Sequence, residues 1–465
     1  MTKSIVLPIG DFILSIVALY CALFLRFGSI PGTEMFNLTG IKLIVFGFVL
    51  LFLSFMLEMY SQEKDGGKKE LLVKVFGGIS IALLVLSALY YLSPIIILGR
   101  GVLVFSLITF GLFQFLWHLS YRVFFGFSGL ARKVLILGSG PLAQTIAEIV
   151  KERNHRYVLA GYINIPSEQL YLPTCSPTID GNGSNGNNGN NGNSGLEDII
   201  NKNKEKVDKI VVSLSERRGV FPVKEVLNCK FSGVDVVDAP SFYEEMTGKL
   251  LIEEITPSWF IFSDGFKITP FKCNVKRVLD IFFSSIGLIF SLPLLPIIAL
   301  AIKINSPGPI FFKQLRVGER EKPFTLYKFR TMHLDAEKVS GAVWAKKEDL
   351  RVTRVGKLLR KIRLDEFPQF YNVLSGDMSI VGPRPERPEF VEQLKKLIPY
   401  YSQRHFVRPG ISGWAQIRYP YGSSVSDALE KLRYDLFYVK HMSLFLDVMI
   451  IMETIKVVLF GRGAR

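Results

Sequence analysis

The sequence predicts a membrane protein of mixed class: four N-terminal transmembrane helices, a Rossmann-like α/β module, and a mixed, mainly helical C-terminal domain with a re-entrant membrane helix. Three observations support this prediction. Four apolar stretches of near-membrane length open the chain, a glycine turn between a strand pattern and a helix pattern follows, and a fifth apolar stretch contains two prolines. The chain is 49% hydrophobic and its apolar residues come in blocks, which indicates membrane segments rather than one large core.

Three domains are expected within the 465 residues. They are a four-helix transmembrane region at 1–125, a Rossmann-like domain at 126–268 and a C-terminal domain at 273–465. The four cysteines show no C-x-x-C spacing and the five histidines are scattered, which argues against a disulfide framework, a zinc site and a histidine-based metal centre. We therefore expect the soluble parts to lie in a reducing compartment.

The four N-terminal stretches are each close to the ~20 residues with which a helix crosses a bilayer. Lysines between the second and third stretches, and Arg122, Arg132 and Lys133 after the fourth, mark the cytoplasmic sides by the positive-inside rule. The N-terminus and the chain after residue 122 are then cytoplasmic. The alternative is a buried four-helix core of a soluble protein. The stretches span 9–26, 41–59, 74–97 and 101–120.

A glycine turn follows in Gly138-Ser-Gly140-Pro-Leu-Ala143, between an apolar strand and a helical pattern. This is the G-x-G-x-x-A form of the dinucleotide fingerprint, in which glycines let the backbone approach a pyrophosphate at a helix N-terminus. The acidic residue expected about 20–25 positions later is missing, because the second strand ends in Asn164. We therefore expect Gly138 and Gly140 to form a candidate nucleotide loop whose role is regulatory or structural rather than NAD-dependent redox chemistry.

The rest of this module is interrupted by a segment of low complexity. Residues 181–195 consist only of Gly, Asn and Ser, so they have nothing to bury and are expected to form a disordered insertion in a surface loop. Two further strands are expected at 207–213 and 234–238.

The fifth apolar stretch, at 279–303, is long enough to cross the membrane. Basic residues flank both of its ends, so the positive-inside rule places both ends in the cytoplasm. Pro293 and Pro296 interrupt it, and each removes a helix hydrogen bond and favours a bend. These features favour a re-entrant helix that returns to the same face. The alternative, a straight crossing, would place everything after residue 303 outside the cell.

The formal net charge is +15, and most of the basic excess lies after residue 303. A basic excess can indicate nucleic acid, anionic lipid or phosphate-bearing substrates. In a membrane-tethered chain, phosphates of a substrate are favoured over nucleic acid, and we expect no nucleic-acid partner.

Three local patterns in this basic region suit chemistry on phosphates. Adjacent carboxylates stand beside several cations, where a carboxylate stays ionised and suits a nucleophile or a metal ligand. A Pro-Arg-Pro turn holds a guanidinium on a stiff backbone, and arginine binds phosphate in a bidentate fork. Taken alone, the first could be a solvated acidic pair and the second an ordinary tight turn. The patterns are Tyr327-Lys328-Phe-Arg330, Arg360-Lys-Ile-Arg363-Leu-Asp365-Glu366 and Gly382-Pro383-Arg384-Pro385-Glu386.

In this order, and together with Arg408-Pro-Gly-Ile-Ser-Gly413-Trp414, the patterns resemble those of the bacterial monotopic phosphoglycosyl transferases. The resemblance covers about 273–465. The arrangement with four preceding helices and a Rossmann-like module is similar to the large members, the polyprenyl glycosylphosphotransferases of exopolysaccharide synthesis. The stretch from Ile417 to the end is similar to an exosortase-associated subgroup.

The resemblance implies an enzyme that moves a sugar 1-phosphate from a UDP-sugar to a polyprenyl phosphate and releases UMP. The expected polyprenyl phosphate is undecaprenyl phosphate. It makes Asp365 the nucleophile and Glu366 the ligand of a Mg²⁺ ion. Arg360 and Arg384 are then expected to contact phosphate or the nucleotide. Lys328, Arg330, Pro383 and Pro385 complete the expected substrate-binding set.

The resemblance also implies a location at the cytoplasmic face of the bacterial inner membrane, and homodimerisation is an expectation at the level of the family. The re-entrant helix of the family breaks at a Ser-Pro pair, whereas here Ser291 and Pro293 are separated by one residue. Two rival functions stay open: a glycosyltransferase that releases UDP, and a non-catalytic membrane scaffold or nucleotide sensor.

The last apolar run, at 443–460, carries three charges in 18 residues. This composition predicts an interfacial helix rather than a crossing. The alternative is a buried core helix.

Overall fold

The computed structural model describes most of the chain, and the account below concerns those residues. The expected disordered insertion at 181–195 lies outside them, as does the loop at 61–67 that contributes to the predicted orientation. The described residues are 2–28, 33–60, 68–125, 131–152, 157–164, 178–180, 207–214, 221–255, 257–334, 351–419, 422 and 424–460.

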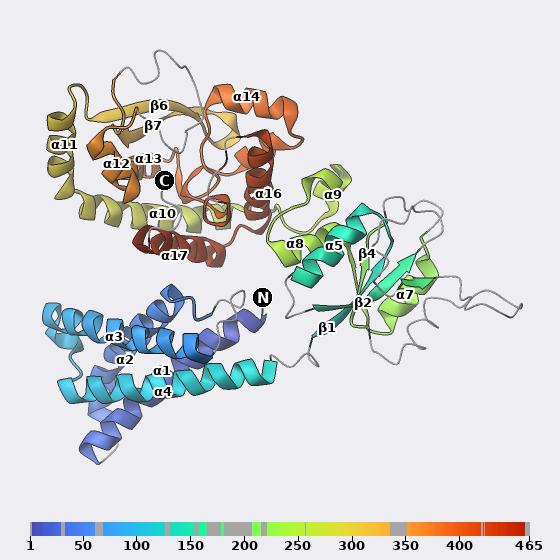
Figure 1. The fold of residues 1–465 in the computed structure, drawn as a ribbon. Helices are drawn as coiled ribbons and strands as arrows, with labels where there is room; N and C mark the ends of the chain where they lie inside the picture. The colour runs from blue at the N-terminus through green and yellow to red at the C-terminus, as the bar shows by residue number, and fades with distance from the viewer. Residues whose placement is uncertain are drawn as a thin grey trace, which may run out of the picture. The chain divides into compact units, whose positions relative to one another are not determined.

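The N-terminal region folds into four long helices at the expected places (Figure 1). Three of them are long and apolar enough to cross a membrane, and a shorter apolar stretch, Gly40–Met56, lies in the other. The helices pack through a shared apolar cluster that includes Ala18, Phe46, Leu86 and Leu107. The helices are α1 (Thr2–Phe27), α2 (Thr33–Met56), α3 (Lys68–Leu92) and α4 (Arg100–Phe125), with a short 3₁₀ turn η1 (Pro94–Ile96) before α4.

A polar network lies inside this apolar bundle. The carboxylate of Asp11 is fully buried and accepts hydrogen bonds from Tyr60 Oη at 2.8 Å and Gln114 Nε2 at 2.6 Å. His118 Nε2 lies 3.2 Å from the same carboxylate. Because a buried polar group is costly unless it is paired, this network joins α1, α4 and the end of α2 in one arrangement.

A five-stranded sheet follows, in the order β3-β2-β1-β4-β5. The pairs β1–β2, β1–β4 and β2–β3 are parallel, and the sheet is buried through Leu135, Ile163 and Ile210. The strands at 132–137 and 209–212 are nearly continuous runs of apolar residues, which is the pattern of parallel strands buried on both faces of a sheet. The elements are β1 (Arg132–Leu137), α5 (Pro141–Glu152), β2 (Tyr157–Asn164), β3 (Thr178–Asp180), β4 (Lys209–Val212), α7 (Val223–Phe231) and β5 (Asp235–Asp238).

The chain divides into two compact units, Met1–Val236 and Val237–Arg465. We call the second the C-terminal unit. It begins with α8 (Ala239–Thr247), η3 (Ile252–Glu254) and α9 (Pro257–Phe262), which precede the region expected to form the C-terminal domain. The expected domain limits, with the boundary at 268–273, stay a prediction, and the division observed here falls about 30 residues earlier along the chain.

Residues 239–255 pack within the C-terminal unit. Leu250, Ile252 and Ile255 lie in one apolar cluster with residues of α14 (Pro388–Leu397) and α16 (Val425–His441). Trp414 Nε1 donates to the carbonyl of Gly248 at 2.8 Å, and the buried Lys440 pairs with Glu244 at 2.7 Å.

Two helices, α10 (Pro270–Ser291) and α11 (Leu294–Asn305), cover the fifth apolar stretch and meet at an angle of 60°. Between them stand Leu292 and Pro293, and the missing N–H groups of Pro293 and Pro296 explain why one helix does not run through. Together the pair is long and apolar enough for a broken span or a re-entrant loop. That the pair returns to one face of a membrane stays a prediction.

The remaining elements build the body of the unit. An antiparallel hairpin, β6 (Phe311–Val317) with β7 (Pro323–Phe329), and a short parallel pair, β8 (Ser379–Val381) with β9 (Gly410–Ser412), are surrounded by helices. The other elements are η4 (Glu319–Glu321), α12 (Arg354–Lys361), η5 (Leu364–Glu366), α13 (Gln369–Ser375), η6 (Tyr401–Phe406), α15 (Trp414–Arg418) and α17 (Leu444–Phe460).

The last helix, α17, runs beside α10 (Figure 1). Its Asp447 is buried and bonded to Lys276 of α10 at 2.8 Å and to Tyr438 of α16 at 2.7 Å. The carboxylate of Asp447 is therefore paired inside the protein, as the alternative of a buried core helix would predict. The outer face carries exposed apolar side chains, including Phe445 and Val448, which is the face an interfacial helix presents. The interfacial placement stays a prediction.

Candidate active site

The sequence before the acidic pair explains how Asp365 and Glu366 are presented. Helix α12 is capped by Thr353, whose side chain accepts the N–H of Gly356 at 2.9 Å, and its Leu359 packs into the apolar cluster of α11 and β7. The helix ends at Lys361, and Arg363 then adopts a left-handed conformation with φ of 58°. This turn directs the short helix η5, with both carboxylates, into the unit.

The two carboxylates are buried and have opposite surroundings. Glu366 Oε1 accepts from Lys328 Nζ at 3.0 Å and from Arg384 Nη2 at 2.9 Å, and Arg363 lies 3.7 Å from its other oxygen. Asp365 is only 7% exposed, and its Oδ1 is buried without a hydrogen-bond partner among the residues that the structure describes. One carboxylate is thus neutralised by cations, while its neighbour keeps a free acceptor.

The pKa directions follow from this arrangement. Burial opposes the charge of Glu366, but the cations of Lys328 and Arg384 outweigh it and hold the pKa of Glu366 well below its ordinary value. Burial and the adjacent charge of Glu366 raise the pKa of Asp365, although Lys328 and Arg360 act in the opposite direction. Burial lowers the pKa of Lys328, an effect that the charge of Glu366 partly offsets. Glu366, with a lowered pKa, therefore lies beside Asp365, with a raised pKa.

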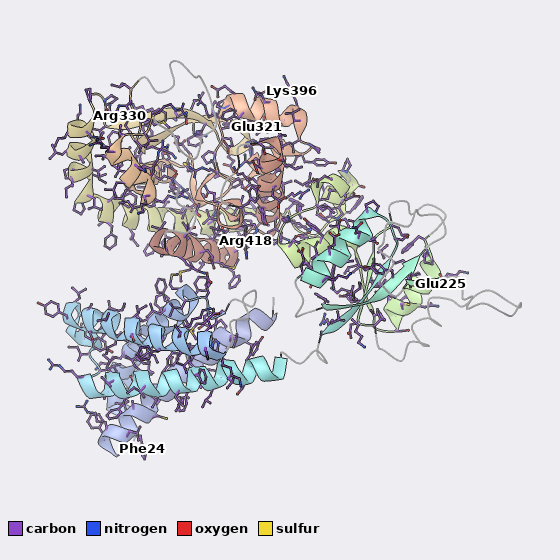
Figure 2. All side chains as sticks on the ribbon, in the orientation of Figure 1. Phe24, Glu225, Glu321, Arg330, Lys396 and Arg418 are labelled. Carbon is purple, nitrogen blue, oxygen red and sulfur yellow. The ribbon has the colours of Figure 1, made fainter. Side chains whose placement is uncertain are left out.

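Lys328 and Arg330 come from the same strand pattern but serve different places. Lys328 lies on β7 and reaches Glu366, and with Arg316, Gln369 and Arg384 it lines a small pocket. Arg330, which is labelled in Figure 2, is buried. It donates to the carbonyls of Ser306 at 2.6 Å and Pro307 at 2.8 Å. Arg330 therefore fastens the turn between α11 and β6, and no described contact joins it to the carboxylates.

Arg360 lies on α12, one turn before the acidic pair. Its Nε donates to Thr331 Oγ1 at 2.9 Å, and its charge acts on Asp365. As a whole, the residue is half-buried. Arg360, Lys328 and Arg384 thus place three cations around Asp365 and Glu366.

The Pro383-Arg384-Pro385 loop is held by the second motif, Arg408-Pro-Gly-Ile-Ser-Gly413. Gly382 and Gly410 pack backbone against backbone: a Cβ on Gly410 would lie 2.1 Å from the nitrogen of Gly382. Only glycine permits this approach. All three loop carbonyls accept hydrogen bonds: Pro383 O from Gly410 N at 2.9 Å, Arg384 O from Arg404 Nη2 at 2.9 Å, and Pro385 O from Arg316 Nη1 at 3.0 Å.

Arg316 and Arg404 belong to none of the patterns that predict the site from the sequence. Each is an isolated arginine in a basic region, and no spacing distinguishes it from solvated neighbours. The only hint in the sequence concerns Arg404, because it stands four residues before the motif that starts at Arg408.

The candidate nucleotide loop lies in the other unit. Gly138 has φ of 124°, and a Cβ there would lie 2.8 Å from Ser213 Oγ at the end of β4. Ser139 is fully buried, and Gly140 O accepts the N–H of Gln144 as α5 begins. The glycines therefore serve a tight strand-to-helix turn. Nucleotide binding there stays a prediction.

The acidic pair suits the predicted Mg²⁺. Among the described residues no group of three or more His, Cys, Asp or Glu could hold a metal by itself. Mg²⁺ is often bound by one or two carboxylates with substrate phosphates and water completing the shell. Glu366 is such a carboxylate, and Asp365, whose Oδ1 has no hydrogen-bond partner among the described residues, lies beside it, so the residues fit a metal that arrives with a phosphate-bearing substrate.

Comparison with known proteins gives a consistent picture. The family model described as bacterial sugar transferase matches residues 271–461. The UDP-N-acetylgalactosamine-undecaprenyl-phosphate N-acetylgalactosaminephosphotransferase of Aeromonas hydrophila is 43% identical over 237 residues, 51% of this chain and 55% of that protein. The undecaprenyl-phosphate glucose phosphotransferase of Komagataeibacter xylinus is 33% identical over 343 residues, 72% of this chain and 60% of that protein.

A shorter relative is matched almost entirely. The exopolysaccharide production protein PSS of Rhizobium leguminosarum bv. phaseoli is 42% identical over 186 residues, which are 39% of this chain and 93% of that protein. The chain thus spans a little over half the length of the first two relatives and nearly all of the third. The residues that the family model matches, 271–461, include Asp365, Glu366 and Arg384.

Proposed function

Because the chain belongs to the bacterial sugar transferase family, as a polyprenyl glycosylphosphotransferase, we propose that it transfers a sugar 1-phosphate from a UDP-sugar to undecaprenyl phosphate. The observation that carries this proposal is the buried acidic pair, in which Glu366 is ion-paired to Lys328 and Arg384 while Asp365 Oδ1 has no partner within the described part of the chain. A solvated acidic pair would have neither the burial nor the two cations.

In the first half-reaction, an Asp365 oxygen attacks the β-phosphorus of the UDP-sugar. A bond forms between the carboxylate and phosphorus, the bond to the bridging oxygen breaks, and UMP leaves with the electron pair. The enzyme then carries the sugar phosphate as an aspartyl mixed anhydride. The free Oδ1 supports this role, because a nucleophile has to reach the substrate without first giving up a protein partner.

In the second half-reaction, a phosphate oxygen of undecaprenyl phosphate attacks the same phosphorus. The bond to Asp365 breaks, the carboxylate is regenerated, and the product is a lipid diphosphate that carries the sugar. Such a ping-pong sequence uses one nucleophile for donor and acceptor in turn.

The cations of the site have a defined task in both steps. A diphosphate repels a carboxylate, and Lys328, Arg360 and Arg384 offset that repulsion in a buried setting, where charges act strongly. A Mg²⁺ ion held by Glu366, with Asp365 beside it, would supply further stabilisation of the phosphate charge. Pro383 and Pro385 keep Arg384 on a stiff turn.

The membrane setting is part of the proposal. Helices α1 to α4 anchor the chain in the bacterial inner membrane, the pair α10–α11 enters it as a re-entrant helix, and the acidic pair faces the cytoplasm, where UDP-sugars are available. The strand order 3-2-1-4-5 supports a Rossmann-like module. Homodimerisation is proposed from the family alone.

Nucleotide release tests this function. Full-length protein in detergent or nanodiscs is incubated with Mg²⁺ and a panel that includes UDP-glucose and UDP-N-acetylgalactosamine, with and without undecaprenyl phosphate. We expect multiple-turnover UMP release that needs the lipid, is lost in Asp365→Asn and persists in the exposed control Glu389→Gln. Release of UDP would instead make the protein a glycosyltransferase, and no release from any donor would favour the scaffold or sensor.

A further inference from the structure

A second arginine, Arg404, contacts the backbone of the loop that carries Arg384. Arg404 of η6 is 5% exposed, and its Nη2 donates to the carbonyl of Arg384 at 2.9 Å. The side chain of Arg384 in turn reaches Glu366 at 2.9 Å. Arg384 therefore has two contacts of different kinds. Its carbonyl accepts from the buried Arg404, and its side chain donates to Glu366 of the acidic pair.

The guanidinium of Arg404 is itself fixed by two further residues. Its Nη2 lies 2.8 Å from Asp435 Oδ2 on α16, and its Nη1 donates to Tyr401 Oη at 2.7 Å. Asp435 is 2% exposed. Carbonyl, carboxylate and phenol thus surround one planar group, which is the geometry that the fork of arginine can satisfy and the compact head of lysine cannot.

Holding a loop with a buried charge carries a large desolvation cost. Removing an ion pair from water is costly, and well-packed apolar residues often stabilise a core as well or better. Pro383 and Pro385 have no N–H, so within the Pro-Arg-Pro turn the two prolines can be tethered only through their carbonyls, which accept from Gly410 N and Arg316 Nη1. The central carbonyl, that of Arg384, accepts from the buried guanidinium of Arg404, whereas that of Pro385 accepts from the half-buried Arg316.

We infer that Arg404, with Asp435 as its counterion, is a positioning residue that fixes Arg384 in the orientation that meets the donor diphosphate. The inference rests on the proposed function, since that function supplies the phosphates Arg384 binds. Arg404 touches neither carboxylate in any described contact and acts only through the loop.

A double-mutant cycle tests this dependence. The variants are Arg404→Lys, Arg384→Ala and their combination, and the readout is kcat/KM for lipid-dependent UMP release. Since a displacement of about 1 Å can cost about 100-fold, we expect Arg404→Lys to lower kcat/KM by about 10- to 100-fold in the wild-type background. In the Arg384→Ala background the further loss should be less than about twofold, because coupled residues are not additive. Equal losses in both backgrounds would overturn the inference.

Hydrogen exchange on the full-length protein gives a readout independent of activity. Amides at 379–387, including Gly382 N bonded to Ser412 O, should exchange faster in Arg404→Lys and in the milder Asp435→Asn. The matched control is Lys440→Gln, which breaks an equally buried ion pair with Glu244 away from the loop and should leave these amides protected. Wild-type protection in both loop variants would refute the positioning role. Lack of UMP release from wild type would refute the proposed function alone, because exchange still decides how the loop is held.

Discussion

The segment at 237–269 is expected to be required for the C-terminal unit to fold, although the family match starts only at residue 271. Three of its side chains, Leu250, Ile252 and Ile255, are 1%, 1% and 6% exposed and lie in the cluster with α14 and α16. At about 1.5–3 kcal/mol for each buried aliphatic side chain, their loss removes roughly 6 kcal/mol. Lys440 would also lose its buried partner Glu244, which adds to the cost.

This loss is comparable to the whole stability of a typical domain, about 5–15 kcal/mol. We therefore expect a fragment of residues 237–465 to unfold cooperatively in detergent and a fragment of residues 271–465 to lack a cooperative transition. The assay is thermal unfolding followed by circular dichroism, with both fragments purified in the same detergent.

Point variants of the longer fragment separate packing from chain length. Ile252→Ala should cost about 2–5 kcal/mol and lower the Tm by roughly 5 °C or more, whereas the exposed neighbour Glu254→Ala should leave it unchanged. A 271–465 fragment that melts within about 2 °C of the longer one would refute the reasoning, since that difference is below 1 kcal/mol. Equal Tm values for Ile252→Ala and Glu254→Ala would refute it as well.

Two further predictions concern single cations of the site. Lys328→Met removes a charge that lowers the pKa of Asp365, so the pKa of this nucleophile should rise further above its ordinary value. Because UMP release needs ionised Asp365, the acid limb of its pH profile should move to higher pH, and an unmoved limb would contradict the assignment. Arg330→Ala leaves the carbonyls of Ser306 and Pro307 without their donor, at about 1–3 kcal/mol each, so the Tm should fall while the KM for the UDP-sugar stays within about twofold. A large rise in that KM with an unchanged Tm would instead support the expected place of Arg330 in the substrate-binding set.

The elements that the sequence predicted well are those with a strong local signal. The helices α1 to α4 follow from continuous apolar runs, and the break between α10 and α11 lies at Pro293, where a helix cannot keep its hydrogen bonds. The strand–turn–helix at 132–152 follows from an apolar run that ends in Gly138.

The elements that the sequence did not reveal depend on partners far along the chain. Residues 237–262 belong with the C-terminal unit because Glu244, Leu250 and Ile252 meet α14 and α16, about 150 to 200 residues later. Likewise, the buried carboxylate of Asp11 inside the helical bundle is satisfied by Gln114 and His118, more than 100 residues away.

The candidate site shows the same division. The sequence by itself determined which residue types are present, their order and the family they indicate, because adjacent acids, a Pro-Arg-Pro turn and a glycine-rich motif are local patterns. Only the tertiary structure decided their partners. Lys328 and Arg384 contact Glu366, whereas Arg330 donates to backbone carbonyls between α11 and β6. Arg404 donates to the carbonyl of Arg384 in the Pro-Arg-Pro loop. The physical reason is that ion pairing and burial depend on distance in space, which residues of identical chemistry in one basic region do not reveal.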